Sequence, residues 1–187
     1  MNPLLICIFI GVVWTALLIV VGLWRMPSAI TRLYVRGFGR RIGAEPWNRM
    51  GDPTQAQAGP GGVVRDSPDM VNMFGVYDAS REPVRIRCKV PDWDTYWSIS
   101  FFAWNTDNFY VLNDRAAKSK DLELIVTAPG TQYRKQGNEE AIASPTARGV
   151  VLVRTVVKNR DDAEEVARAK QLMSQITIAP CSQAKAG

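Results

Sequence analysis

The chain opens with an unbroken apolar run. No side chain from Pro3 to Trp24 is charged. At a rise of about 1.5 Å per residue this run makes a helix about 33 Å long, enough to cross the hydrocarbon core of a bilayer. Trp24 stands where an interfacial aromatic is expected, and Arg25 follows it at once. The pattern predicts a single transmembrane helix over residues 1–25.

A cleaved signal peptide is the competing interpretation of this run. No basic residue precedes the apolar segment, no small-x-small cleavage site closes it, and it is longer than the apolar region of a signal peptide. A lipoprotein signal ending at Cys7 is disfavoured as well, since no apolar stretch precedes that cysteine. We therefore expect a retained, single-pass anchor.

A second, basic pattern follows the apolar run. Arg32, Arg36 and Arg40 recur every fourth residue, with apolar side chains on the other side. Such spacing predicts a short amphipathic helix over residues 26–43, lying among lipid headgroups. The segment could touch anionic lipid or dock on an acidic partner. The side chains expected to make such contacts are Trp24, Arg25, Arg32, Arg36, Arg40 and Arg41.

Periodicity is absent from residues 44–66. Pro46, Pro53 and the run Gly59-Pro60-Gly61-Gly62 interrupt any regular structure, and no apolar face recurs. The composition is typical of a flexible linker. We expect residues 67–187 to form the folded domain.

Period-two alternation dominates the remaining residues. Between residues 84 and 90 apolar side chains alternate with Arg85, Arg87 and Lys89. Such alternation predicts half-buried strands, which we expect over 84–90, 97–103, 109–112, 122–126, 150–157 and 176–178. Residues 78–83 and 91–94 are short enough for hairpin connections. One helix is predicted over 161–173, with Asp161 as its N-cap. The predicted fold is mainly β: an antiparallel sandwich or open barrel with one peripheral helix.

Charge is distributed unevenly along the chain. Lysine and arginine number 23 and aspartate and glutamate 18, for a net charge of +5. The five arginines before Glu45 account for this excess, so the folded domain is electrically neutral. A neutral domain has no surplus charge with which to bind nucleic acid. The basic segment instead indicates a membrane surface or a membrane-embedded partner.

The side chains that usually carry catalysis are scarce. The chain has no histidine and only three cysteines, none in a Cys-x-x-Cys pair. Histidine-dependent triads, zinc sites and iron–sulfur clusters are therefore not expected, and neither a cofactor nor a metal is predicted. Asp92 and Asp94 are best interpreted as turn acids, and Ser119, between two lysines, as a solvated loop residue. The sequence favours a protein that is not an enzyme.

Two polar residues could form a pair. Arg154 shares its strand face with Val150, Leu152 and Val156, and a buried arginine needs a carboxylate. Asp114, at the end of another predicted strand, is the candidate partner, either in a structural ion pair or in a ligand site. An aromatic cleft beside this pair would be formed by Trp93, Tyr96, Trp104 and Tyr110.

Four segments resemble a known family. They include a Trp-Ser pair and an Asn-Asp-Arg triplet, in the order Pro83–Arg85, Tyr96–Ser100, Asn108–Arg115 and Val151–Arg154. Residues 71–181 thereby resemble the bacterial domain-of-unknown-function family twelve-fifty-four, most closely its short, membrane-anchored members. The resemblance implies a β-sandwich outside the cytoplasmic membrane, with no established reaction or cofactor.

The resemblance also bears on the cysteines. Members of this family often carry one cysteine at the position of Gly75 and another near the C-terminus, where this chain has Cys181. Cys88 would lie about opposite Gly75 across a hairpin, so the resemblance suggests a Cys88–Cys181 disulfide; two separate thiols are the alternative. The disulfide and the family's usual compartment favour a periplasmic domain, whereas arginines following the helix favour a cytoplasmic one.

Two functions remain open from the sequence. The first is a non-catalytic accessory subunit that stabilises a larger membrane complex, of the photosynthetic or respiratory type, in the bacterial cytoplasmic membrane. The second is a domain that binds or processes a lipid- or sugar-like envelope component. The expected partners are integral membrane subunits and anionic lipid.

Overall fold

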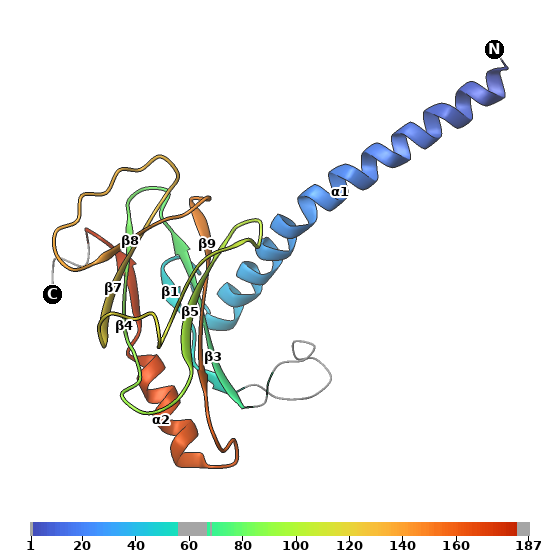
Figure 1. Cartoon of the computed structure of the whole chain (residues 1–187). Coiled ribbons are helices and arrows are strands. Elements are labelled where there is room, and N and C mark those ends of the chain that lie inside the picture. Colours follow the sequence, from blue (N-terminus) through green and yellow to red (C-terminus); the bar gives the residue numbers. More distant parts are fainter. Residues whose placement is uncertain (1, 56–66, 68, 183–187) are drawn as a thin grey trace.

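A computed structural model describes residues 2–55, 67 and 69–182. Its first element is one long helix, α1 (Pro3–Ile42), which projects far beyond the folded domain (Figure 1). The Asn2 side chain accepts a hydrogen bond from the Leu4 amide at its start, and Gly43 ends it with a φ of 62°. In the described part of the chain, α1 is the helix that is long and apolar enough to cross a membrane.

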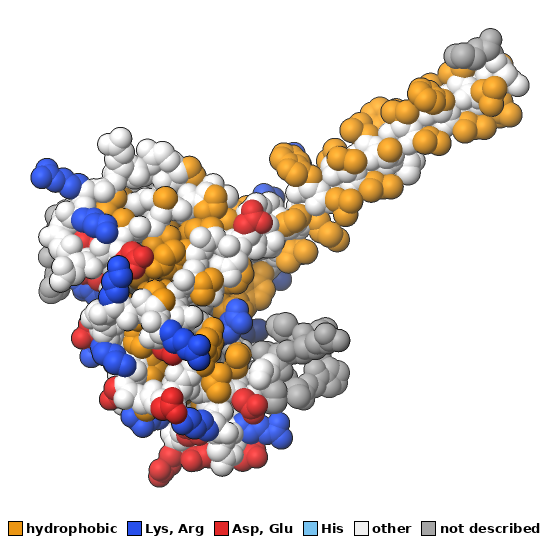
Figure 2. Space-filling view, in the orientation of Figure 1, with side chains coloured by type: hydrophobic (Ala, Val, Ile, Leu, Met, Phe, Trp, Pro, Cys, Tyr) orange, Lys and Arg blue, Asp and Glu red, His pale blue; other side chains and the backbone are white. Residues whose placement is uncertain are grey.

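The predicted division of this region into a transmembrane helix and a separate basic helix differs from the structure. Pro27 lies inside α1 without ending it, and helical structure continues through residue 42. The projecting part is covered with exposed hydrophobic side chains (Figure 2). The last turns are different, because Thr31, Val35 and Phe38 are buried against the domain.

The domain is a sandwich of two sheets, which confirms the predicted class. The first sheet runs in the order β1-β3-β9-β5-β6, and β2 pairs with β3. Its strands are β1 (Arg49–Met50), β2 (Thr54–Gln55), β3 (Met70–Asp78), β5 (Trp97–Ala103), β6 (Asn108–Asn113) and β9 (Arg148–Val156). All of its pairings are antiparallel.

The second sheet runs in the order β10-β4-β7-β8. Its strands are β4 (Val84–Lys89), β7 (Asp121–Thr127), β8 (Glu140–Ala143) and β10 (Thr177–Pro180). β7 and β8 are parallel. Buried side chains of both sheets, among them Trp97, Ile86 and Val153, form one core cluster, because alternate residues of each strand face the other sheet.

Helix α2 (Ala163–Ser174) closes one end of the sandwich, away from the free part of α1 (Figure 1). Val166, Ala169 and Met173 form its buried face. Its N-cap is Asp162, one residue after the predicted cap, and the Asp162 carboxylate accepts hydrogen bonds from the amides of Glu164 and Glu165.

Two sequence expectations about connections need correction. Residues 78–83 and 91–94 do not close hairpins, because β3 and β5 belong to the first sheet and β4 to the second. The predicted linker contains β1 and β2, which extend the edge of the first sheet beside β3. Hydrogen bonding to β3 gives this proline-containing segment regular structure that its own composition does not favour. Residues 56–66 of that linker lie outside the described residues.

Candidate functional site

The last turns of α1 lie on the outer face of the first sheet. Val35 and Phe38 of the helix form a second apolar cluster with Val76 and Val150. Strand alternation turns Val76 and Val150 away from the core between the sheets, whereas Tyr77 and Val151 face into it. The last turns of α1 are therefore part of the folded domain.

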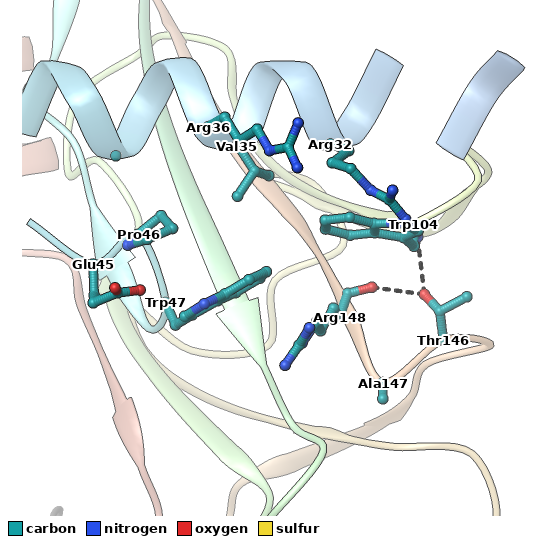
Figure 3. A pocket seen from close by; sticks show the side chains of 11 residues that line it. Arg32, Val35, Arg36, Glu45, Pro46, Trp47, Trp104, Thr146, Ala147 and Arg148 are labelled. Carbon is teal, nitrogen blue, oxygen red and sulfur yellow. Dashed lines mark hydrogen bonds between the residues drawn. The ribbon is translucent and has the colours of Figure 1, made fainter. Parts of the chain in front are cut away.

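A pocket of about 690 Å³ opens along one flank of α1 (Figure 3). The helix forms one wall, the residues directly after it form the second, and the segment from Thr146 to Arg148 with Trp104 forms the third. The lining residues are Arg32, Val35, Arg36, Gly39, Glu45, Pro46, Trp47, Trp104, Thr146, Ala147 and Arg148.

Two indoles face each other in this pocket. The ring centroids of Trp47 and Trp104 lie 6.1 Å apart, with 36° between the ring planes. The backbone amide of Trp104 donates to the Thr146 hydroxyl at 2.9 Å, and that hydroxyl donates to the Arg148 carbonyl at 2.7 Å (Figure 3). Neither indole N–H donates a hydrogen bond within the described residues, so both are available to a ligand.

Arg148 connects the pocket walls. Its Cζ lies 4.5 Å from the ring centroid of Trp47, and its Nε donates to Asp78 Oδ2 at 2.8 Å. Partial burial acts to raise the pKa of Asp78, but hydrogen bonds from Ser80 and from the Arg148 guanidinium outweigh it and hold the pKa below its usual value. Asp78 therefore stays ionised and fixes Arg148.

The segment after α1 is held to the end of β3 by the side chain of Asn48. The Asp78 amide donates to the Asn48 side-chain oxygen at 2.8 Å. Asn48 has a φ of 54°, in the left-handed region that asparagine tolerates better than most residues. This turn brings Trp47 back over the sheet and sets the position of its ring.

The structure separates the arginines that the sequence grouped together. Arg32 and Arg36 line the pocket, one helical turn apart. Arg40 and Arg41 occupy the last turn of α1, and Arg25 belongs to its free part; none of these three lines the pocket. Trp24 is 77% exposed, as an interfacial residue of a free helix would be.

The opposite flank of α1 is apolar. Ile30 and Tyr34 of the helix, together with Phe74 and Leu152 of the sheet, line an open groove of about 200 Å³. The ring centroids of Tyr34 and Phe74 are 5.2 Å apart. This groove continues the exposed hydrophobic surface of α1 onto the domain.

The predicted Asp114–Arg154 pair does not form. Asp114 exchanges backbone and side-chain hydrogen bonds with Trp97, a residue whose side chain faces the core. Arg154 pairs in register with Ser98, one residue along β5. Because successive strand residues point to opposite faces, Arg154 lies on the outer face of the sheet, away from Asp114.

The predicted Cys88–Cys181 disulfide is also wrong, since both thiols are free. The amide of Cys181 donates to the carbonyl of Pro83, at the start of β4, whereas Cys88 lies five residues further along this strand region. At about 3.3 Å per residue the two positions are roughly 17 Å apart, well beyond the 7 Å reach of a disulfide. Gly75, in the first sheet, is not opposite Cys88 either.

The other sequence candidates are dispersed over the surface. Asp92 pairs with Arg168, and Asp94 with Lys158. Ser119 accepts a hydrogen bond from the amide of Asp121. The four aromatic residues of the predicted cleft do not converge: Trp93 stacks under Arg168, Tyr110 contacts Phe101, Tyr96 is exposed, and Trp104 lies in the pocket beside α1.

Sequence reasoning missed Trp47, Thr146 and Arg148. Trp47 stands in a segment predicted to be a linker, and the other two belong to a strand end with no motif of its own. An aromatic residue within a Gly/Pro-rich stretch was the one available signal, because such stretches rarely need a large apolar side chain. Among the described residues, no group of three or more metal-ligating side chains comes together.

Comparison with known proteins identifies the family of this domain. The sequence profile described as "Protein of unknown function (DUF1254)" matches residues 47–180, which confirms the resemblance inferred from the motifs. No curated protein matches the sequence. The match begins at Trp47, so the family region includes Trp47, Trp104 and the segment from Thr146 to Arg148 of the pocket, but not the part of the lining that α1 contributes.

Two solved structures are similar. The crystal structure of the VPA0106 protein from Vibrio parahaemolyticus has a TM-score of 0.68 and 16% sequence identity, over 86% of this chain and 36% of that one. A putative uncharacterised protein from Burkholderia cenocepacia has a TM-score of 0.41 and 16% identity, over 64% of this chain and 31% of that one. This chain spans about a third of the Vibrio protein's length, and the likeness concerns the fold alone.

Proposed function

The chain belongs to the DUF1254 family of proteins of unknown function, and we propose that it is a single-pass, non-catalytic accessory subunit of a larger membrane complex. The observation that carries the proposal is the continuity of α1 from its apolar start into the domain. Because α1 is one continuous helix, a partner that binds its apolar part also fixes the position of the sandwich.

The face of α1 that carries Gly11 and Gly22 is suited to contact with another helix. Gly11, Thr15, Leu18 and Gly22 follow one another at spacings of three or four residues and so share one helix face. Phe38, which packs on the sheet, is about seven and a half turns from Gly11 at 3.6 residues per turn. The small-residue face therefore points away from the domain, where another helix can approach without meeting the sandwich.

The glycines on this face have no internal role. A Cβ added at Gly11 or Gly22 would meet nothing within 4 Å. Because they have no side chain, these glycines allow close contact with another transmembrane helix.

A non-catalytic role is supported by the environment of the acidic candidates. Asp92 and Asp94 are each engaged with an exposed cation, Arg168 and Lys158. Pairing with Lys158 lowers the pKa of Asp94, so that it stays ionised and is a poor proton donor at neutral pH.

The test is co-purification in mild detergent. Gly11→Ile combined with Gly22→Ile is expected to release the membrane partners, because added methyl groups hold a neighbouring helix away. Val13→Ile combined with Leu17→Ile changes the opposite face of the same segment and is expected to keep them. A monomer of the unchanged protein without co-purifying subunits, or equal retention by both double variants, would contradict the subunit role.

We propose a periplasmic orientation for the domain, following the family's usual compartment. The cysteine argument for this orientation no longer holds, and the arginines after the apolar run argue for the other side. Protease added to intact spheroplasts is expected to remove residues 70–187. Full protection of these residues until the membrane is opened would place the domain in the cytoplasm.

The second candidate function is binding of a lipid- or sugar-like envelope component. The specific observation in its favour is the 690 Å³ pocket beside α1, with its paired indoles.

A further inference from the structure

The pocket beside α1 contains positive charge that the protein does not neutralise. Arg148 is paired with Asp78. Arg32 and Arg36 make no ion pair with any carboxylate in the described part of the chain. Residues four apart on a helix hold their Cβ atoms about 5–6 Å apart, so both guanidinium groups can reach one anion. Figure 3 shows them projecting from α1 on the side of Trp104.

We propose that this pocket binds a phosphate group, with Arg32 and Arg36 as its charged ligands and Trp47 and Trp104 as the walls for the group attached to the phosphate. This inference is independent of any partner of the transmembrane segment. It assigns the ligand class from the lining residues alone.

Guanidinium chemistry favours phosphate. The planar fork of an arginine places two parallel N–H groups against two phosphate oxygens, and two arginines can saturate a phosphate that one cannot. The indole rings of Trp47 and Trp104 offer apolar surface and two N–H donors to the remainder of the ligand. A small inorganic anion would leave this second half of the pocket unused.

The walls are built before a ligand arrives. Thr146 fixes the backbone of Trp104, and Arg148 stacks on Trp47 while Asp78 holds it. A site whose walls are already ordered loses less conformational entropy when it binds.

Glu45 is the carboxylate among the lining residues. Figure 3 shows it at the other end of the pocket from Arg32. Its charge opposes that of a bound anion but is separated from the arginines, so that it weakens binding without blocking the site. Removing that charge is expected to strengthen binding, an effect opposite to the loss of an arginine.

The position of Arg32 along α1 is compatible with two sources of the phosphate group. Arg32 follows Trp24 by eight residues, about 12 Å of helix. One headgroup layer is about 5–8 Å deep, so an upright helix places Arg32 a few ångströms outside that layer, within reach of its long side chain. A lipid headgroup and a free phosphate compound can both reach it, and the two are separated by experiment.

The experiment uses the full chain in non-ionic detergent, titrated calorimetrically with inorganic phosphate and with dioctanoyl phosphatidic acid. Arg32→Gln combined with Arg36→Gln is expected to weaken binding at least about tenfold, the loss of roughly 1.4 kcal/mol of charge-assisted hydrogen bonding. Arg40→Gln combined with Arg41→Gln removes the same charge from the same helix outside the pocket, and is expected to change affinity less than about twofold. Glu45→Gln is expected to tighten binding.

The two probes identify the source. Tight binding of dioctanoyl phosphatidic acid that millimolar inorganic phosphate does not displace assigns a lipid headgroup. Binding of inorganic phosphate itself, competing with the lipid, assigns a free phosphate compound. Any one of three results overturns the proposal. The two double arginine variants bind the probes equally, Glu45→Gln weakens binding, or neither probe binds the unchanged protein. All four substituted arginines and Glu45 are exposed, so the variants are expected to fold, which circular dichroism checks.

Discussion

The guanidinium of Arg148 lies over the indole of Trp47, with its Cζ 4.5 Å from the ring centroid. This contact joins the first residues after the anchor helix to the start of β9. Because the Arg148 Nε also donates to Asp78 at the end of β3, three separate segments meet at one point. Together with the packing of Val35 and Phe38 on the sheet, this junction joins α1 and the segment after it to the sandwich.

Trp47→Ala is expected to loosen α1 from the domain. The substitution removes the stacking with Arg148 and the contact with Trp104, together worth about 2 kcal/mol of stability. Amide exchange should increase over residues 31–42. Trp93→Ala is the matched control, because Trp93 also stacks with an arginine, Arg168, at 4.1 Å but beside α2. The control should leave exchange in residues 31–42 unchanged; an equal increase would contradict the junction.

Gly149→Ala is expected to destabilise the sandwich by about 3 kcal/mol or more, because overpacking forces the backbone to shift. An added Cβ would lie 2.2 Å from both the carbonyl oxygen of Phe102 and the hydroxyl of Tyr77. Gly37→Ala, at a helical position with nothing within 4 Å, should be neutral or slightly stabilising. Thermal unfolding in detergent measures both, and similar values for the two variants would contradict the close approach at Gly149.

Asp162→Ala is expected to cost about 1 kcal/mol, the usual worth of a helix N-cap. The Asp162 carboxylate accepts hydrogen bonds from two amides at the start of α2, at 2.9 Å and 3.3 Å. Asp161→Ala removes the same charge one residue earlier and should change stability by only a few tenths of a kcal/mol. Urea unfolding compares the two. A larger loss of stability in Asp161→Ala would indicate that Asp161 is the N-cap, as the sequence pattern predicted.

Stability is expected to fall as the pH rises from about 9 toward 12. Burial raises the pKa of Cys88 from 9.0 to about 12, so the unfolded chain loses this proton first and the free energy of unfolding falls as the pH rises between these two values. The slope for one such group approaches about 1.4 kcal/mol per pH unit. Tyr77 adds to the fall above pH 10, since burial raises its pKa to about 12 in spite of a hydrogen bond with Ser144.

Cys88→Ala should flatten the fall between pH 9 and 10, before Tyr77 contributes. The urea midpoint measured across this range checks it. Cys181→Ala is the control, because Cys181 is only partly buried and lies at the far end of β4, and it should leave more of the slope in place. An unchanged slope in Cys88→Ala would mean that its thiol does not stay protonated in the folded protein.

Local patterns in the sequence were sufficient to predict the main secondary-structure elements. An apolar run without a charge predicts a helix from hydropathy alone, and alternation at residues 84–90 predicts β4, because a half-buried strand requires it. The number of alternating strands then predicted an antiparallel sandwich or open barrel, and the family resemblance implied a sandwich as well. Arg32 and Arg36 were selected by their helical spacing, which is also a local property.

Pairing between distant segments was decided only by the tertiary structure. The register of β10 against β4 places Cys181 beside Pro83 and away from Cys88, and no local pattern contains that choice. The strands β1 and β2 are regular because β3 offers them hydrogen-bonding partners, which a Gly/Pro-rich segment does not indicate by itself. The same holds for the pocket: the sequence determined a basic helix, whereas folding placed Trp47, Trp104 and Arg148 beside it, since such contacts depend on residues about 100 positions apart.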